Sequence, residues 1–247
     1  MSYRAIKPDS VIGTIDRLTL RIRERFAGRG LAQVCAELGE VARRDRDRVA
    51  ALRRPNVWVR AGVLSVAALL ALSLGLLLKE VKLPSLLRLW RPGEEAGAVI
   101  TLLQGVDSAV NIGLLFGAGL FFLLRHEERD KRRRALEDLY ELRALAHVID
   151  MHQLTKDPTT LLAPDSRTAS SPVETMTPFE LARYLDYCSE MLSLVAKVAA
   201  FYAQDMRDPV VIESVSDLEA MTTNLSRKIW QKIMIVEQAS LAAARTP

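Results

Sequence analysis

The chain is poor in the residues that build most metal and redox sites. Its 247 residues include 2 cysteines and 3 histidines. Cys35 and Cys188 lie far apart and match neither a CxxC pair nor any other metal-binding spacing. We therefore expect two free, buried thiols, without a disulfide framework and without a metal site.

Motifs for nucleotide, acyl or nucleic-acid chemistry are absent as well. The sequence has no glycine-rich phosphate loop, no GxSxG and no alternation of strands with helices. Aromatic residues make up 6% of the chain, and none is interleaved with the basic runs as in proteins that stack nucleic-acid bases. These absences predict a protein that is not an enzyme, holds no cofactor and does not bind nucleic acid.

Three ionisable residues remain as candidates for a metal or acid–base site: His147, Asp150 and His152. On a helix the first two share a face, whereas His152 lies about 140° away from His147. This is not the HExxH spacing of zinc proteases. We expect these side chains to make hydrogen bonds on the helix surface. A metal-dependent hydrolase is the less favoured alternative, and metal that copurifies with the protein would support it.

What the sequence does contain is two long apolar runs, residues 57–78 and 98–124. The mean hydropathy of the whole chain, +0.09, hides this segregation. A helix needs about 20 apolar residues to cross a bilayer. We predict a transmembrane hairpin in residues 56–124 with a short external loop at 79–97. No cleaved signal peptide is expected, because the first run follows a long charged segment.

Basic residues near these runs predict their orientation. Residues 41–60 and 125–144 hold seven Lys and Arg each, whereas the loop 79–97 holds four. The positive-inside rule therefore predicts that both termini are cytoplasmic. The abundance of Ala, Leu and Arg suggests a bacterial source, and so the bacterial inner membrane.

The second run carries a polar stripe, formed by Gln104, Asp107, Ser108 and Asn111. An ionised aspartate in hydrocarbon costs several kcal/mol, so Asp107 must face protein or water or carry a proton. The stripe is interpreted either as an ion or proton path between protomers or as a clamp that hydrogen-bonds across helices. We favour the clamp, because polar groups commonly hold membrane helices together.

The same run has a second face made of small residues, Gly105, Ala109, Gly113 and Gly117. Small residues four positions apart line one side of a helix and let another helix approach closely. We predict tight packing on this face, either against the first span or against another protomer.

The flanking segments are predicted to form amphipathic helices. In residues 1–55, helical spacing indicates helices at 9–26, with Ser10 as N-cap, and at 31–53. They either pack on other cytosolic helices, which we favour, or lie on the membrane surface. Residues 125–154 continue the second span as a basic helical stalk. We assign its cationic side chains to lipid headgroups: Arg125, Arg129, Lys131, Arg132, Arg133 and Arg134.

The C-terminal part begins with residues 155–176, whose Ser, Thr and Pro content predicts a flexible linker. Thr177, Pro178 and Glu180 then form a strong helix start. Apolar spacings of four and three follow and predict a coiled-coil-like antiparallel hairpin at 177–241. Asp208-Pro209 ends its first helix and is expected to cap the second. Near its end, the stretch RKIWQKIMIVEQ is apolar on more than one side and suggests a contact surface.

Together these features predict an all-α, two-span integral membrane protein that contacts anionic lipid headgroups. We expect a non-enzymatic, homo-oligomeric scaffold or signalling module that binds a cytosolic protein through its C-terminal hairpin. The alternative is an oligomeric ion or proton channel, with the second spans around a pore and Asp107 in its lumen. A scaffold tolerates Asp107→Asn, whereas a channel that uses this charge does not.

Overall fold

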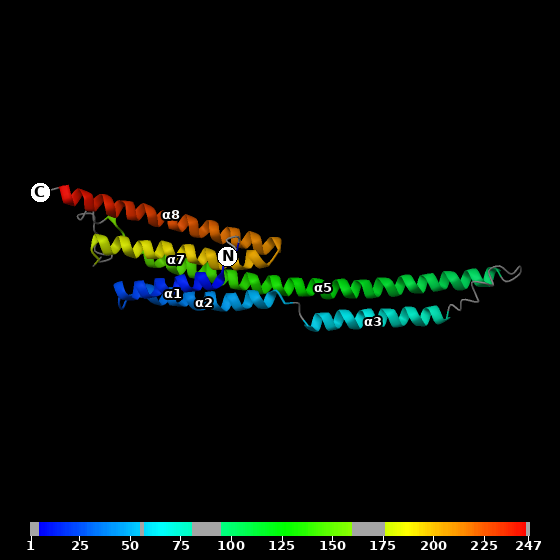
Figure 1. Cartoon of the computed structure of the whole chain (residues 1–247). Coiled ribbons are helices and arrows are strands. Elements are labelled where there is room, and N and C mark those ends of the chain that lie inside the picture. The colour runs from blue at the N-terminus through cyan, green and yellow to red at the C-terminus, as the bar shows by residue number, and fades with distance from the viewer. Residues whose placement is uncertain (1–4, 55–56, 81–94, 160–175, 246–247) are drawn as a thin grey trace. The chain divides into compact units, whose positions relative to one another are not determined.

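The computed structural model describes residues 5–54, 57–80, 95–159 and 176–245. All regular secondary structure in these ranges is α-helical, which confirms the all-α class. In chain order the helices are α1 (Pro8–Arg25), α2 (Leu31–Leu52), α3 (Val57–Glu80), α5 (Glu95–Leu154), α7 (Pro178–Asp205) and α8 (Pro209–Arg245) (Figure 1).

The helices belong to two compact units. The bundle unit comprises residues 1–53 and 132–247, and the apolar unit comprises residues 54–131. Helix α5 is continuous from Glu95 to Leu154, so the second apolar run and the basic segment after it lie in one helix. This continuity follows from a sequence that places no proline or glycine between them.

In the bundle unit, α1 starts earlier than the sequence pattern suggested. Lys7 is the N-cap, makes no side-chain capping hydrogen bond, and is followed by Pro8. The prediction of Ser10 as N-cap is wrong, because a proline with its fixed φ and missing N–H is favoured in the first turn of a helix. Gly28, with a φ of +80°, lies in the turn between α1 and α2, where glycine is favoured.

The core of the bundle unit is built from one apolar face of each helix. Figure 1 shows α7 beside α8 and α1 beside α2, and α7 also contacts both α1 and α2. The apolar face of the basic stalk is buried in this core. Burying a side chain of this size stabilises the fold by about 2 kcal/mol. Examples from the five contributing helices are Ile15, Leu38, Leu139, Leu185 and Ile229.

The start of α7 forms as its sequence predicted. The Thr177 hydroxyl accepts a hydrogen bond from the N–H of Glu180 at 3.2 Å, and the Glu180 carboxylate accepts one from the N–H of Thr177 at 2.8 Å. This reciprocal capping box satisfies two backbone donors that a helix start leaves unpaired. Helix α8 continues to Arg245, beyond the predicted boundary at 241, because its last turns are rich in alanine.

In the apolar unit, α3 and α5 each contain an apolar window long enough to cross a membrane. The windows begin at Val59 and Leu103, and neither contains a buried residue. Leu64, for example, is 69% exposed and Leu115 is 73% exposed. A core helix of a water-soluble protein would bury such side chains, so their exposure supports association with a membrane. The predicted loop 79–97 and linker 155–176 lie largely outside the described residues.

Candidate functional site

The polar stripe lies along an exposed side of α5. Gln104, Asp107, Ser108 and Asn111 are all exposed. The Asn111 side-chain amide donates a hydrogen bond to Oδ2 of Asp107 at 3.3 Å, one helical turn away. This hydrogen bond lies within a single helix, so both the clamp and the ion path stay predictions.

The small-residue face of α5 is open in the described part of the chain. A Cβ added at Gly113 or Gly117 would meet no atom within 4 Å. On α3, by contrast, a Cβ at Gly62 would lie 3.5 Å from Cδ1 of Leu123, an ordinary packing distance. The two glycines of α5 therefore leave room for a helix that the described residues do not supply.

The basic residues after the apolar run are partly engaged by their own helix. Lys131 Nζ lies 2.7 Å from Glu127, and Arg133 Nε lies 3.1 Å from Glu137. The Arg125 guanidinium lies 5.6 Å from the ring centroid of Phe121. The Arg133–Glu137 pair is exposed, and such pairs are worth about 0–1 kcal/mol, so Arg133 can still turn to an anionic surface. Arg129 and Arg134 are also exposed.

Arg132 has a structural role that the sequence did not reveal. Its Nη2 and Nε atoms lie 2.7 Å and 2.8 Å from Oδ2 of Asp208. The other oxygen of Asp208 accepts hydrogen bonds from the N–H groups of Val210 and Val211 at 3.0 Å and 3.3 Å, at the start of α8. Asp208 thus caps α8, as predicted, and also ties it to α5. Partial burial opposes its ionisation, but these hydrogen bonds outweigh burial and lower the pKa of Asp208.

The three residues considered for metal or acid–base chemistry do not converge. His147 is exposed, and Asp150 accepts a hydrogen bond from Gln153 at 2.6 Å. His152 Nδ1 lies 3.2 Å from the hydroxyl of Tyr184 on α7. Among the described residues, no three potential ligands are placed to hold a metal ion. The contact between His152 and Tyr184 joins the end of α5 to α7.

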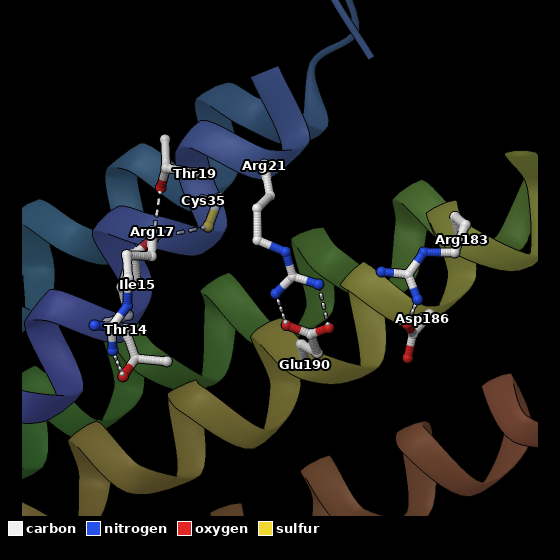
Figure 2. A network of polar contacts seen from close by, with 9 residues as sticks. All are labelled: Thr14, Ile15, Arg17, Thr19, Arg21, Cys35, Arg183, Asp186 and Glu190. Atoms are coloured by element: carbon white, nitrogen blue, oxygen red, sulfur yellow. Dashed lines mark hydrogen bonds and ion pairs between the residues drawn. The ribbon is translucent and has the colours of Figure 1, made fainter. Parts of the chain in front are cut away.

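A hollow of about 430 Å³ between α1 and α7 is lined by Arg21, Arg25 and Arg183. Figure 2 shows that two of these arginines face carboxylates of α7. Both terminal nitrogens of Arg21 contact Glu190, at 3.1 Å and 3.3 Å, and Arg183 contacts Asp186 at 2.5 Å. Since carboxylates offset these two charges, the hollow serves helix–helix contact better than the binding of an anion.

An apolar groove of about 660 Å³ along α7 and α8 is the strongest candidate for a binding surface. Three large side chains in its lining, Phe179, Trp230 and Leu241, are 65%, 54% and 60% exposed. Clusters of exposed apolar side chains mark contact surfaces more often than single ones do, and aromatic anchors carry much of the energy of protein interfaces. We call this surface the Phe179–Trp230 groove.

The rim of the Phe179–Trp230 groove carries charges of both signs, from Arg183, Asp186 and Glu237. The sequence indicated the α8 side of this groove, because Trp230 belongs to the stretch that is apolar on more than one side. It did not indicate the α7 side. Phe179 follows the proline of a helix start and carries no periodic signal that distinguishes it from a core residue.

Comparison with profiles of known protein families, with curated proteins and with solved structures finds no match to this chain.

Proposed function

We propose that this chain is a non-enzymatic, membrane-anchored helical scaffold that works as a homo-oligomer. The observation that carries the proposal is the exposed Phe179–Trp230 groove, which offers a large apolar contact surface on the bundle unit. The two apolar helices anchor the chain, and the basic residues on both flanks favour cytoplasmic termini in a bacterial inner membrane.

A second copy of the chain is the occupant of the groove that best fits its chemistry. A two-fold interface uses the same patch on both subunits and must therefore complement itself. The rim meets this requirement, because Glu237 of one copy can pair across the two-fold axis with Arg183 of the other, which also contacts Asp186 of its own helix. The open glycine face of α5 supports the same partner, since a second copy would bring a second α5.

The first test is the mass of the full-length protein in lipid nanodiscs, measured by native mass spectrometry. We expect a dimer that dissociates in the double variant Phe179→Ser/Trp230→Ser. Its control is Leu20→Ser on α1, because Leu20 is 53% exposed and does not line the groove. A monomeric wild-type protein, or equal dissociation of control and double variant, would contradict the proposal.

The same measurement separates the scaffold from the channel. A closed ring of four or more protomers would place several copies of Asp107 around one axis and would favour the channel. Conductance recordings on Asp107→Asn would then decide, because a channel that uses the charge changes its conductance while a scaffold shows none.

A further inference from the structure

The bundle unit contains a carboxylate, Asp45, whose side chain is fully buried. Asp45 on α2 is 0% exposed, and neither of its side-chain oxygens has a hydrogen-bond partner among the described residues. The nearest cation is Arg44, whose Nε lies 4.0 Å from Oδ1 of Asp45. Buried carboxylates are normally paired and hydrogen-bonded, because an ionised oxygen without donors is costly in a dry environment.

The charge of a second buried carboxylate acts on Asp45. Asp138 on α5 is 3% exposed, accepts a hydrogen bond from the Tyr202 hydroxyl on α7 at 2.8 Å, and pairs with Arg48 on α2. Burial raises the pKa of Tyr202, as do the neighbouring carboxylates, so its hydroxyl remains a donor. Asp138 therefore has both a hydroxyl donor and a guanidinium partner.

The charges around this pair do not balance. Arg44 and Arg48 on α2 face three carboxylates, Asp45 on the same helix and Asp138 and Glu141 on α5. Arg44 is already held by Glu141 at 2.5 Å, and Arg48 by Asp138. If all five groups were ionised, one negative charge would remain uncompensated at the most buried position.

We propose that Asp45 is a buried proton-binding site, and that the bound proton keeps α2 packed against α5 and α7. A proton removes the surplus charge and turns one acceptor oxygen of Asp45 into a donor beside Asp138. Proton loss leaves two charged carboxylates in the same core and loosens α2. The proposal does not depend on self-association or on the membrane orientation.

The pKa of Asp45 supports this assignment. Burial raises it to about 7, helped by the charges of Asp138 and Glu141 and opposed by Arg44 and by the hydroxyl of Tyr202 on α7. Because the pKa is higher in the folded state than in the unfolded chain, folding binds a proton between these two values. The contribution of Asp45 to the free energy of unfolding is therefore fully present below about pH 4. It decreases as the pH rises to about 7 and is lost above that.

The test is hydrogen–deuterium exchange of α2 in the full-length protein in nanodiscs. Between pH 6 and pH 8, we expect the opening equilibrium of α2 to increase about tenfold after correction for intrinsic exchange rates. This change should vanish in Asp45→Asn and persist in Asp47→Asn, a control at an exposed position of the same helix. An identical pH dependence in wild type and Asp45→Asn would overturn the proposal.

Two further measurements keep the result decisive. If Asp45→Asn does not fold, infrared difference spectra of the wild-type protein between pH 6 and pH 8 should show the carbonyl band of a protonated carboxylic acid disappearing. The lack of such a band would refute a bound proton.

Replacing sodium and potassium by N-methylglucamine should leave hydrogen exchange of α2 unchanged at pH 6. A loss of protection would identify a metal cation as the ligand instead.

Discussion

At the scale of single residues, the fold uses a few charged side chains for two tasks at once. Asp208 both caps α8 and receives Arg132 from α5, so a local helix start becomes a contact between two helices. Lys232 acts similarly, because its Nζ donates hydrogen bonds to the carbonyl oxygens of Gln153 and Lys156 at 2.9 Å and 3.0 Å, near the end of α5. Orphan carbonyls at a helix end require such donors.

Replacing Asp208 by alanine should lower the free energy of unfolding by about 1–2 kcal/mol, because it removes an N-cap and a charged partner together. Chemical denaturation followed by circular dichroism measures this loss. Asp217→Ala, at an exposed position further along α8, is the control and should change stability little.

Acid should reproduce the Asp208→Ala effect in the wild-type protein. The pKa of Asp208 is lowered in the folded state, so its contribution is present above the unfolded pKa of about 4 and is lost as the pH falls through the folded value. Wild type and Asp208→Ala should therefore become more similar in stability as the pH is lowered below about 4. A constant difference across this range would contradict the assigned role.

At the scale of elements, α5 is the helix that both units share. Its first part is apolar and exposed, and its last part buries an apolar face in the bundle unit. No helix breaker separates the two parts, so the chemistry of the side chains changes along one continuous backbone. The glycine face belongs to the exposed part, where close approach of another helix is sterically allowed.

Gly117→Leu should lower the dimer fraction in nanodiscs, because leucine would fill the close approach between two copies of α5. Gly119→Leu is a matched control, since this residue lies about 200° further around the helix. A Cβ at either glycine meets no atom within 4 Å, so neither substitution creates a clash within the described chain. Equal masses for both variants would show that this face is not an interface.

At the scale of the whole molecule, the distribution of charge predicts which side of the membrane each segment occupies. Labelling of introduced cysteines can test this orientation without removal of the native thiols, because Cys35 and Cys188 are buried. Burial raises the pKa of the Cys35 thiol to about 11 and that of Cys188 to about 12. Both thiols should therefore react slowly with maleimides, which require the thiolate.

In intact cells, a membrane-impermeant maleimide should label Gly93→Cys, which lies in the predicted external loop. It should label Asn224→Cys, at an exposed position of α8, only after the membrane is permeabilised. This result is expected because the flanking segments carry more Lys and Arg than the loop. The opposite labelling pattern would place both termini outside the cytoplasm.

The sequence by itself determined the helices, the two apolar runs and the caps of α7 and α8, because these depend on residues a few positions apart. Helical period, span length and the Thr177–Glu180 box are local properties that no distant contact has to complete. The same reasoning failed at Ser10, where the nearby proline decides the helix start.

Only the tertiary structure decided which distant residues meet. It buries Asp45 and Asp138 in one core, joins Arg132 to Asp208, and places Phe179 and Trp230 along one groove. Each of these pairs joins different helices, and the pairing depends on how the apolar faces of all the helices pack together in one core. A local pattern says which face of a helix is buried, whereas the helix that covers it is selected by packing across the whole chain.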